Sequence, residues 1–222
     1  MFSAFTKAIE QLGEPATRRV LGISIATSIG VFIALLAVVF FLLTKTALFS
    51  IGWLDAAVDL LGGIAVLVLT WLLFPAVVSA CVGLYLDRVA DAVEARHYPH
   101  LPPPREAPLG EVIATTLKFF GVMVGMNLIV LVFLLFPPVF PFVFYSVNGY
   151  LLGREYFELV ASRRMDVTEV RAQRWAHRWA VFAAGLLIAL LLTVPLVNLI
   201  APIIGTAAMV HLAEKWRRTS LA

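Results

Sequence analysis

Two long apolar runs in the first half of the chain predict helices that cross a lipid bilayer. The run at residues 20–44 contains no charged residue. As an α-helix it would be about 37 Å long, more than the ~30 Å hydrocarbon thickness of a bilayer. The run at residues 60–86 is also uncharged and contains Pro75, which bends a helix. We therefore predict spanning helices at residues 15–44 and 60–86.

The first residues of the chain predict a helix with one apolar face. The apolar residues at helical spacing are Phe2, Phe5, Ile9 and Leu12. This pattern is typical of an amphipathic helix on a membrane surface, which we place at residues 1–13. Gly13 would end this helix, and Pro15 suits the first turn of the next one. Because Glu10 and Glu14 lie where a signal peptide is basic, we expect no cleaved targeting segment.

The apolar runs in the second half of the chain are shorter and end at prolines. The run at residues 112–136 reaches Pro137 and Pro138, and the apolar stretch after them has about 11 residues, or roughly 17 Å as a helix. The two runs on either side of Pro195 would each be about 24 Å long. We predict two short helical hairpins, at residues 112–152 and 179–213, that penetrate the membrane only in part.

Nearly all lysines and arginines lie in four segments, at residues 1–19, 87–111, 153–178 and 215–222. The second is a proline-rich linker that favours extended backbone, and the third is rich in arginine. Positively charged loops stay on the cytoplasmic side of a membrane. We therefore expect both ends of the chain to be cytoplasmic.

Composition agrees with a membrane protein. Hydrophobic residues make up 61% of the chain and charged residues 14%, and the mean hydropathy is +0.95. Soluble domains are about half apolar and one quarter charged, so a soluble core cannot account for this excess. We expect one all-α integral membrane domain over residues 1–222. The net charge of +3 is gathered in loops, so we expect no nucleic-acid partner.

The start of the second predicted helix could bind an anion. Its sequence is Ala16-Thr17-Arg18-Arg19, directly after Pro15. A helix N-terminus offers unpaired backbone amides, and together with two guanidinium groups these suit an oxyanion. The alternative is that Arg18 and Arg19 are ordinary positively charged anchors for the helix.

Five polar residues next to apolar runs could line an ion path or its mouth. They are Lys118, Asn127, Asn198, Arg154 and Glu155. A charge inside an apolar run is a functional candidate, but a lysine can equally extend towards the membrane surface. The asparagines could line a polar path or satisfy backbone groups freed near the proline turns.

We expect no metal site, cofactor or enzymatic activity. His97 and His100 lie in the proline-rich linker without a third ligand nearby in the sequence. The chain also contains no phosphate-binding glycine loop, no nucleophile elbow and no pair of carboxylates in an apolar setting.

Two segments resemble a known family of membrane proteins. Residues 194–209 read VPLVNLIAPIIGTAAM and residues 148–158 read NGYLLGREYFE. Both are similar to segments of CysZ-type sulfate permeases, within the wider etoposide-induced membrane-protein family. The order of the elements is similar along nearly the whole chain.

This resemblance implies an oligomeric, all-helical inner-membrane protein with two spanning helices and two pairs of partly penetrating helices. It also implies uptake of sulfate for cysteine synthesis. The family holds sulfate near a Gly-Leu-Arg-Arg type motif after the surface helix, which here corresponds to Ala16, Thr17, Arg18 and Arg19.

Two functions from different classes follow. The first is a sulfate or oxyanion permease or channel that does not hydrolyse ATP, since the chain has no ATP-binding motif. The alternative is a membrane scaffold or regulator that binds a partner or anionic lipid through the six arginines of residues 153–178.

Overall fold

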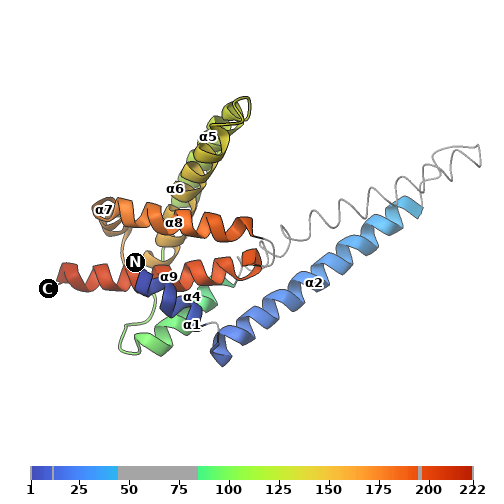
Figure 1. Ribbon diagram of the computed structural model, residues 1–222. Helices are drawn as coiled ribbons and strands as arrows, with labels where there is room; N and C mark the ends of the chain where they lie inside the picture. Colours follow the sequence, from blue (N-terminus) through green and yellow to red (C-terminus); the bar gives the residue numbers. More distant parts are fainter. Residues whose placement is uncertain (1, 12, 45–84, 195–196, 222) are drawn as a thin grey trace, which may run out of the picture. The chain divides into compact units, whose positions relative to one another are not determined.

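The computed structural model describes residues 2–11, 13–44, 85–194 and 197–221, and every regular element in these ranges is a helix (Figure 1). The chain divides into two compact units. The first contains Met1–Arg18 and Leu86–Ala222, and the second contains Arg19–Tyr85. The predicted all-helical fold is confirmed for the described residues.

The second unit contains most of α2, Pro15–Thr44. This helix has the bounds expected for the first spanning helix, and apolar side chains such as Ile33 and Phe41 are exposed along it. The second predicted span, at residues 60–86, lies almost wholly outside the described residues.

The N-terminal helix α1, Phe2–Gln11, confirms the helix predicted at the start of the chain. It ends in a turn in which the amide of Gly13 donates to the carbonyl of Glu10 at 3.1 Å. The buried side chains of α1 are Ala4, Phe5, Ala8 and Gln11. The helix packs against α9, Ala201–Leu221, while Ile9 stays exposed. The face of α1 that is buried therefore matches the predicted apolar face only in part.

The charged segments of the first unit contact one another. Helix α4, Leu86–His97, occupies the first part of the predicted linker. Its buried Glu94 accepts hydrogen bonds from Arg163 at 3.1 Å and from Arg164 at 2.6 Å. The amide of Arg105 also donates to the carbonyl of Arg163. These contacts hold the linker against the arginine-rich segment.

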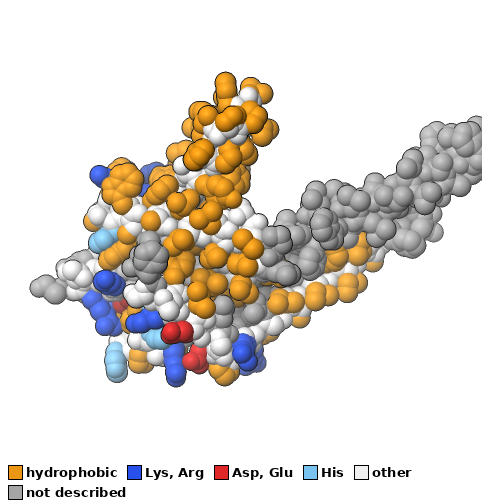
Figure 2. Space-filling view, viewed as in Figure 1, with side chains coloured by type: hydrophobic (Ala, Val, Ile, Leu, Met, Phe, Trp, Pro, Cys, Tyr) orange, Lys and Arg blue, Asp and Glu red, His pale blue; other side chains and the backbone are white. Residues whose placement is uncertain are grey.

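Helices α5, Leu109–Phe133, and α6, Phe140–Ala161, form a hairpin. Hydrophobic side chains cover most of the face of this hairpin that Figure 2 shows, whereas lysine, arginine and histidine side chains gather over α1 and α4. Among the described residues, α5 is long and apolar enough to cross a membrane by itself. Helix α6 continues well past Leu152, where the predicted hairpin leg ends.

Helix α7, Val167–Ala176, begins with a capping box. Asp166 accepts hydrogen bonds from the amides of Thr168 and Glu169, both at 2.8 Å, and Glu169 accepts one from the amide of Asp166. In the sequence, Asp166 followed three residues later by Glu169 predicts a helix start, and the structure confirms it. A bend of 87° at His177 separates α7 from α8, Arg178–Thr193. Together the two helices could form a second, broken span.

Helix α9 follows the short 3-10 helix η1, Val197–Leu199. Every residue from 201 to 214 is buried, because α1, α4, α6 and α8 surround this part of α9. The buried residues include the polar side chains of Thr206, His211 and Glu214. Tyr98 forms a hydrogen bond of 2.9 Å with Nδ1 of His211, and burial raises the pKa of Tyr98.

Three glycines bring the backbones of α6 and α8 into direct contact. Gly149 and Gly153 of α6 lie one turn apart and face Gly185 of α8. A β-carbon on Gly185 would lie 2.6 Å from the α-carbon of Gly153, and closer still to the Gly149 carbonyl oxygen. Small residues at this spacing allow helices to approach closely. The packing of α6 on α8 therefore depends on these three positions.

Replacing Gly185 with alanine is expected to lower the free energy of unfolding by about 1–3 kcal/mol or more, because backbone atoms cannot move aside for the new methyl group. The measurement is thermal unfolding of purified protein in detergent. Gly125→Ala on α5 is the matched control, since a β-carbon there meets no atom of the described residues within 4 Å. Equal stability of the two variants would show that the contact does not support the fold.

Candidate functional site

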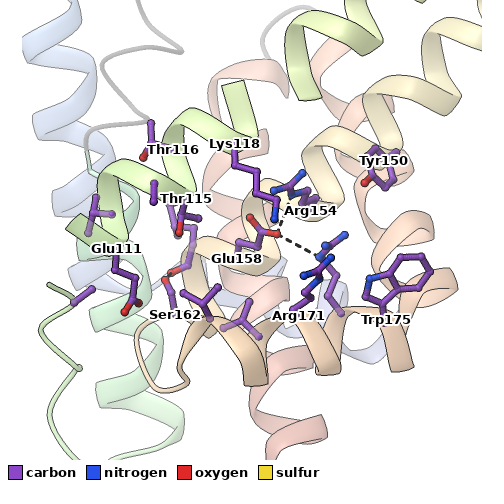
Figure 3. Close-up of a pocket in the computed structure, with 17 residues that line it drawn as sticks. Glu111, Thr115, Thr116, Lys118, Tyr150, Arg154, Glu158, Ser162, Arg171 and Trp175 are labelled. Carbon is purple, nitrogen blue, oxygen red and sulfur yellow. Dashed lines mark hydrogen bonds and ion pairs between the residues drawn. The ribbon is translucent and has the colours of Figure 1, made fainter. Parts of the chain in front are cut away.

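A cavity of about 630 Å³ lies where α5, α6 and α7 meet. Its volume is within the range of small-molecule sites, roughly 300–1,000 Å³. Charged and hydroxyl side chains from all three helices and from the chain around them point into it (Figure 3). Its polar lining residues are Glu111, Thr115, Thr116, Lys118, Tyr150, Arg154, Glu158, Ser162, Arg171, Arg174 and Trp175. We call this space the α5–α7 cavity.

One carboxylate in the α5–α7 cavity is shared by two arginines. Arg154 and Glu158 are four residues apart on α6, so they lie on the same face of the helix. Nε of Arg154 lies 2.8 Å from Oε1 of Glu158, and Nε of Arg174 on α7 lies 3.3 Å from the same oxygen. The side chains of Arg154 and Arg174 are only 7% and 16% exposed. Glu158 can neutralise one of these charges but not both.

Two further cations face the cavity without a carboxylate. Lys118 reaches down from α5 towards Arg154 and Glu158, and Arg171 extends up from α7 (Figure 3). Neither forms an ion pair with any residue in the described ranges. The lining therefore holds two unpaired positive charges beside the shared pair.

The second carboxylate in the lining, Glu111, is already engaged. Arg105, outside the cavity, donates two hydrogen bonds to it, at 2.7 and 2.8 Å. This hydrogen bonding raises the pKa of Arg105 above its usual value. Since Arg105 compensates Glu111, the excess positive charge of Lys118 and Arg171 is left for a ligand.

The chemistry of the lining suits an oxyanion. Guanidinium and ammonium groups donate charge-assisted hydrogen bonds to sulfate, phosphate and carboxylate oxygens. The hydroxyl groups of Thr115 and Thr116 add neutral donors to the lining, whereas the hydroxyl of Ser162 already donates to the carbonyl of Leu159. Because liquid water occupies about 30 Å³ per molecule, the cavity has room for an anion together with part of its hydration shell.

The structure brings two of the five predicted path residues together, because Lys118 and Arg154 both line the α5–α7 cavity. Glu155 is exposed and is not part of its lining. Asn127 donates to the carbonyl of Met123 within α5. Asn198 lies in η1, where its amide donates to the carbonyl of Val194.

The predicted anion motif at Ala16-Thr17-Arg18-Arg19 forms the first turns of α2. Arg18 and Arg19 are exposed, and the amide of Arg18 donates to the carbonyl of Glu14. The side chains of Ala16 and Thr17 lie outside the described part of the chain. The assignment of these four residues to an anion site stays a prediction.

Arg171 and Arg174 were predicted only as members of the arginine-rich segment, and Glu158 was not predicted as a site residue. A local signal exists for part of the site, because the four-residue spacing of Arg154 and Glu158 places them on one helix face. Their grouping with α7 depends on how α6 and α7 pack. Within the described residues, no group of three histidine, cysteine or acidic side chains is arranged to hold a metal ion.

The model of a family described as "Sulfate transporter CysZ/Etoposide-induced protein 2.4" matches residues 4–202, which is most of the chain. No curated protein matches the sequence.

Replacing Glu158 with glutamine is expected to lower the free energy of unfolding by about 3–5 kcal/mol, because Arg154 and Arg174 would be left without a carboxylate in a largely buried position. Thermal unfolding in detergent measures the change. Glu155→Gln is the matched control on the same helix and is expected to stay within about 0.5 kcal/mol of the wild type. A loss of equal size in both variants would contradict the shared-carboxylate arrangement.

Proposed function

The chain belongs to the sulfate transporter CysZ/etoposide-induced protein 2.4 family, and we propose that it is a permease or channel for sulfate or a closely related oxyanion. Under this proposal the ion moves down its gradient without ATP hydrolysis by the chain itself and supplies sulfate for cysteine synthesis. The protein has no catalytic role in this proposal.

The observation that carries this proposal is the excess of positive charge in the α5–α7 cavity. Within the described part of the chain, Lys118 and Arg171 face the cavity without pairing with a carboxylate, and Arg154 and Arg174 share a single one. A cationic site partly shielded from water concentrates anions and replaces some of their hydration. We assign the cavity to the cytoplasmic mouth of the ion path.

A second anion contact in the proposal is the start of α2. Arg18 and Arg19 are exposed there, beside the backbone amides of the first turn. Together with Thr17 and Ala16 they occupy the positions of the family's sulfate motif. Helix N-termini and arginines each attract oxyanions, which supports this assignment.

We propose that the protein lies in the bacterial inner membrane, crosses it several times and forms a homo-oligomer. Two observations support the membrane placement. The hairpin of α5 and α6 has an apolar surface with exposed side chains such as Leu117, Leu131 and Phe142. The charged segments contact one another through ion pairs and through Arg218, which stacks on Tyr98, as expected if both ends of the chain and the two charged loops share the cytoplasmic side.

The arginine-rich segment gives weaker support to a scaffold function. Four of its six arginines are bound to carboxylates of the chain itself, namely Arg154, Arg163, Arg164 and Arg174. Arg163 and Arg164 both bind Glu94, so they are not available for a partner. The transport proposal therefore accounts for more of the described charges.

Replacing Lys118 and Arg171 with glutamine is expected to reduce sulfate uptake into proteoliposomes about tenfold or more, because each loses a charge-assisted hydrogen bond to the ion. The measurement is the initial rate of radiolabelled sulfate uptake. Lys215→Gln, which removes an exposed positive charge from the end of α9, is the control and should keep the wild-type rate. A full rate in the double variant would remove the cavity from the ion path.

The motif at the start of α2 is tested separately in the same assay. The double variant Arg18→Gln with Arg19→Gln should abolish uptake, because the anion would lose both guanidinium groups at its entry. Unchanged uptake in this variant would show that the motif does not bind the ion, without bearing on the cavity. Background uptake by folded wild-type protein would favour the scaffold function.

A further inference from the structure

A groove next to the α5–α7 cavity lies on the side of α7 that faces α8. Its volume is about 200 Å³, and its walls come from α6, α7 and α8. It shares Tyr150, Arg154, Arg174 and Trp175 with the cavity. Arg178, Trp179 and Phe182 of α8 line only the groove. The proposed function makes no use of these three residues, and we call this space the Arg178 groove.

The position of Arg178 is set by two tryptophans. Its guanidinium carbon lies 6.0 Å from the ring centre of Trp175 and 5.8 Å from that of Trp179. Stacking on aromatic rings orients a guanidinium group while leaving its N–H edges available for hydrogen bonds. No carboxylate of the described residues pairs with Arg178. The groove thus presents an oriented and uncompensated cation.

The groove is also cationic as a whole. Arg154 and Arg174 form its inner wall and share only Glu158. The N-terminus of α8 opens beside Arg178, and no side chain caps it. Both features favour a negatively charged group at the mouth of the groove.

An apolar surface leads away from this mouth along α8. Trp179, Phe182 and Leu190 recur at helical spacing on one face of the helix. Trp179 is 73% exposed and Leu190 is 43% exposed. The Trp175 side chain is 57% exposed at the 87° bend between α7 and α8. Exposed tryptophans beside arginines are typical of the boundary between lipid headgroups and acyl chains.

From this arrangement we propose that the Arg178 groove binds the phosphodiester headgroup of an anionic phospholipid, with an acyl chain lying along α8. A ligand with one negative charge and an apolar tail matches a cationic mouth that continues into an apolar face. The small volume fits a headgroup and not a whole lipid. This site goes beyond the proposed transport function and requires only the membrane placement.

The test uses the full chain in phosphatidylcholine nanodiscs that contain a small fraction of brominated phosphatidylglycerol or brominated phosphatidylcholine. Bromine quenches tryptophan emission on contact. The wild type is expected to be quenched with an about fivefold preference for the anionic lipid, as one arginine near an anionic headgroup provides. Trp175→Phe with Trp179→Phe should remove this preferential quenching, which assigns it to the groove.

Arg178→Gln is expected to make the two brominated lipids quench equally. Arg218→Gln is the matched control, because Arg218 also stacks on an aromatic ring, Tyr98, but lies on α9 and outside the groove. It should keep the preference of the wild type. Equal quenching by both lipids in the wild type, or an unchanged preference in Arg178→Gln, would overturn the proposal.

A competition experiment distinguishes a bound lipid from a bound soluble anion. Millimolar inorganic phosphate or sulfate should leave the preferential quenching in place, because neither can replace the contacts of the acyl chain. Loss of the preference under these conditions would show that the groove takes soluble oxyanions, and the lipid assignment would then be wrong.

Discussion

The close contact between α6 and α8 fixes the geometry on which both proposed anion-binding sites depend. Gly149, Gly153 and Gly185 let the two backbones touch, and this depth of approach is possible only without β-carbons. Arg154 follows Gly153 directly on α6, and Arg178 begins α8. The glycine contact therefore determines how far apart these two arginines lie. A second tight fit, where a β-carbon on Gly205 would meet Ile188 at 2.9 Å, packs α9 against α8.

The arginines of this unit fall into two groups, those that are paired with carboxylates and those that outnumber the carboxylates around them. Arg163 and Arg164 are compensated by Glu94 and join the arginine-rich segment to α4. In the α5–α7 cavity and the Arg178 groove, by contrast, arginines outnumber carboxylates. Compensated pairs support structure, whereas uncompensated cations in a partly enclosed space favour anion binding. This contrast is the basis for proposing ligand sites at the α5–α7 cavity and the Arg178 groove in a chain that has many arginines.

Local sequence signals predicted several helix ends correctly. Gly13 and Pro15 mark the junction of α1 and α2, and Asp166 with Glu169 forms the expected capping box. The continuation of α6 beyond Leu152 was missed, because Arg154 looks like the end of an apolar leg. Its charge is instead paired one turn further on by Glu158. Such pairing allows a helix to continue through a charged position.

Other features depend on contacts that local patterns do not contain. The bend at His177 has no proline or glycine beside it, and the ring of His177 stacks on that of Trp216, 4.2 Å away. The composition of the α5–α7 cavity likewise depends on packing between α6 and α7. The sequence predicts Lys118 and Arg154 as candidates for one ion path or its mouth and places Arg171 and Arg174 in the same basic stretch as Arg154. Local patterns do not show that Lys118 of α5 lies beside these arginines.

An oxyanion in the α5–α7 cavity can be detected directly. Selenate is a sulfate analogue whose selenium can be located by anomalous diffraction from crystals of the protein. If the cavity holds the ion, a selenium peak is expected within hydrogen-bonding reach of Lys118, Arg154 and Arg171, and it should disappear when excess sulfate is added. An empty cavity at a selenate concentration that inhibits sulfate uptake would contradict this assignment.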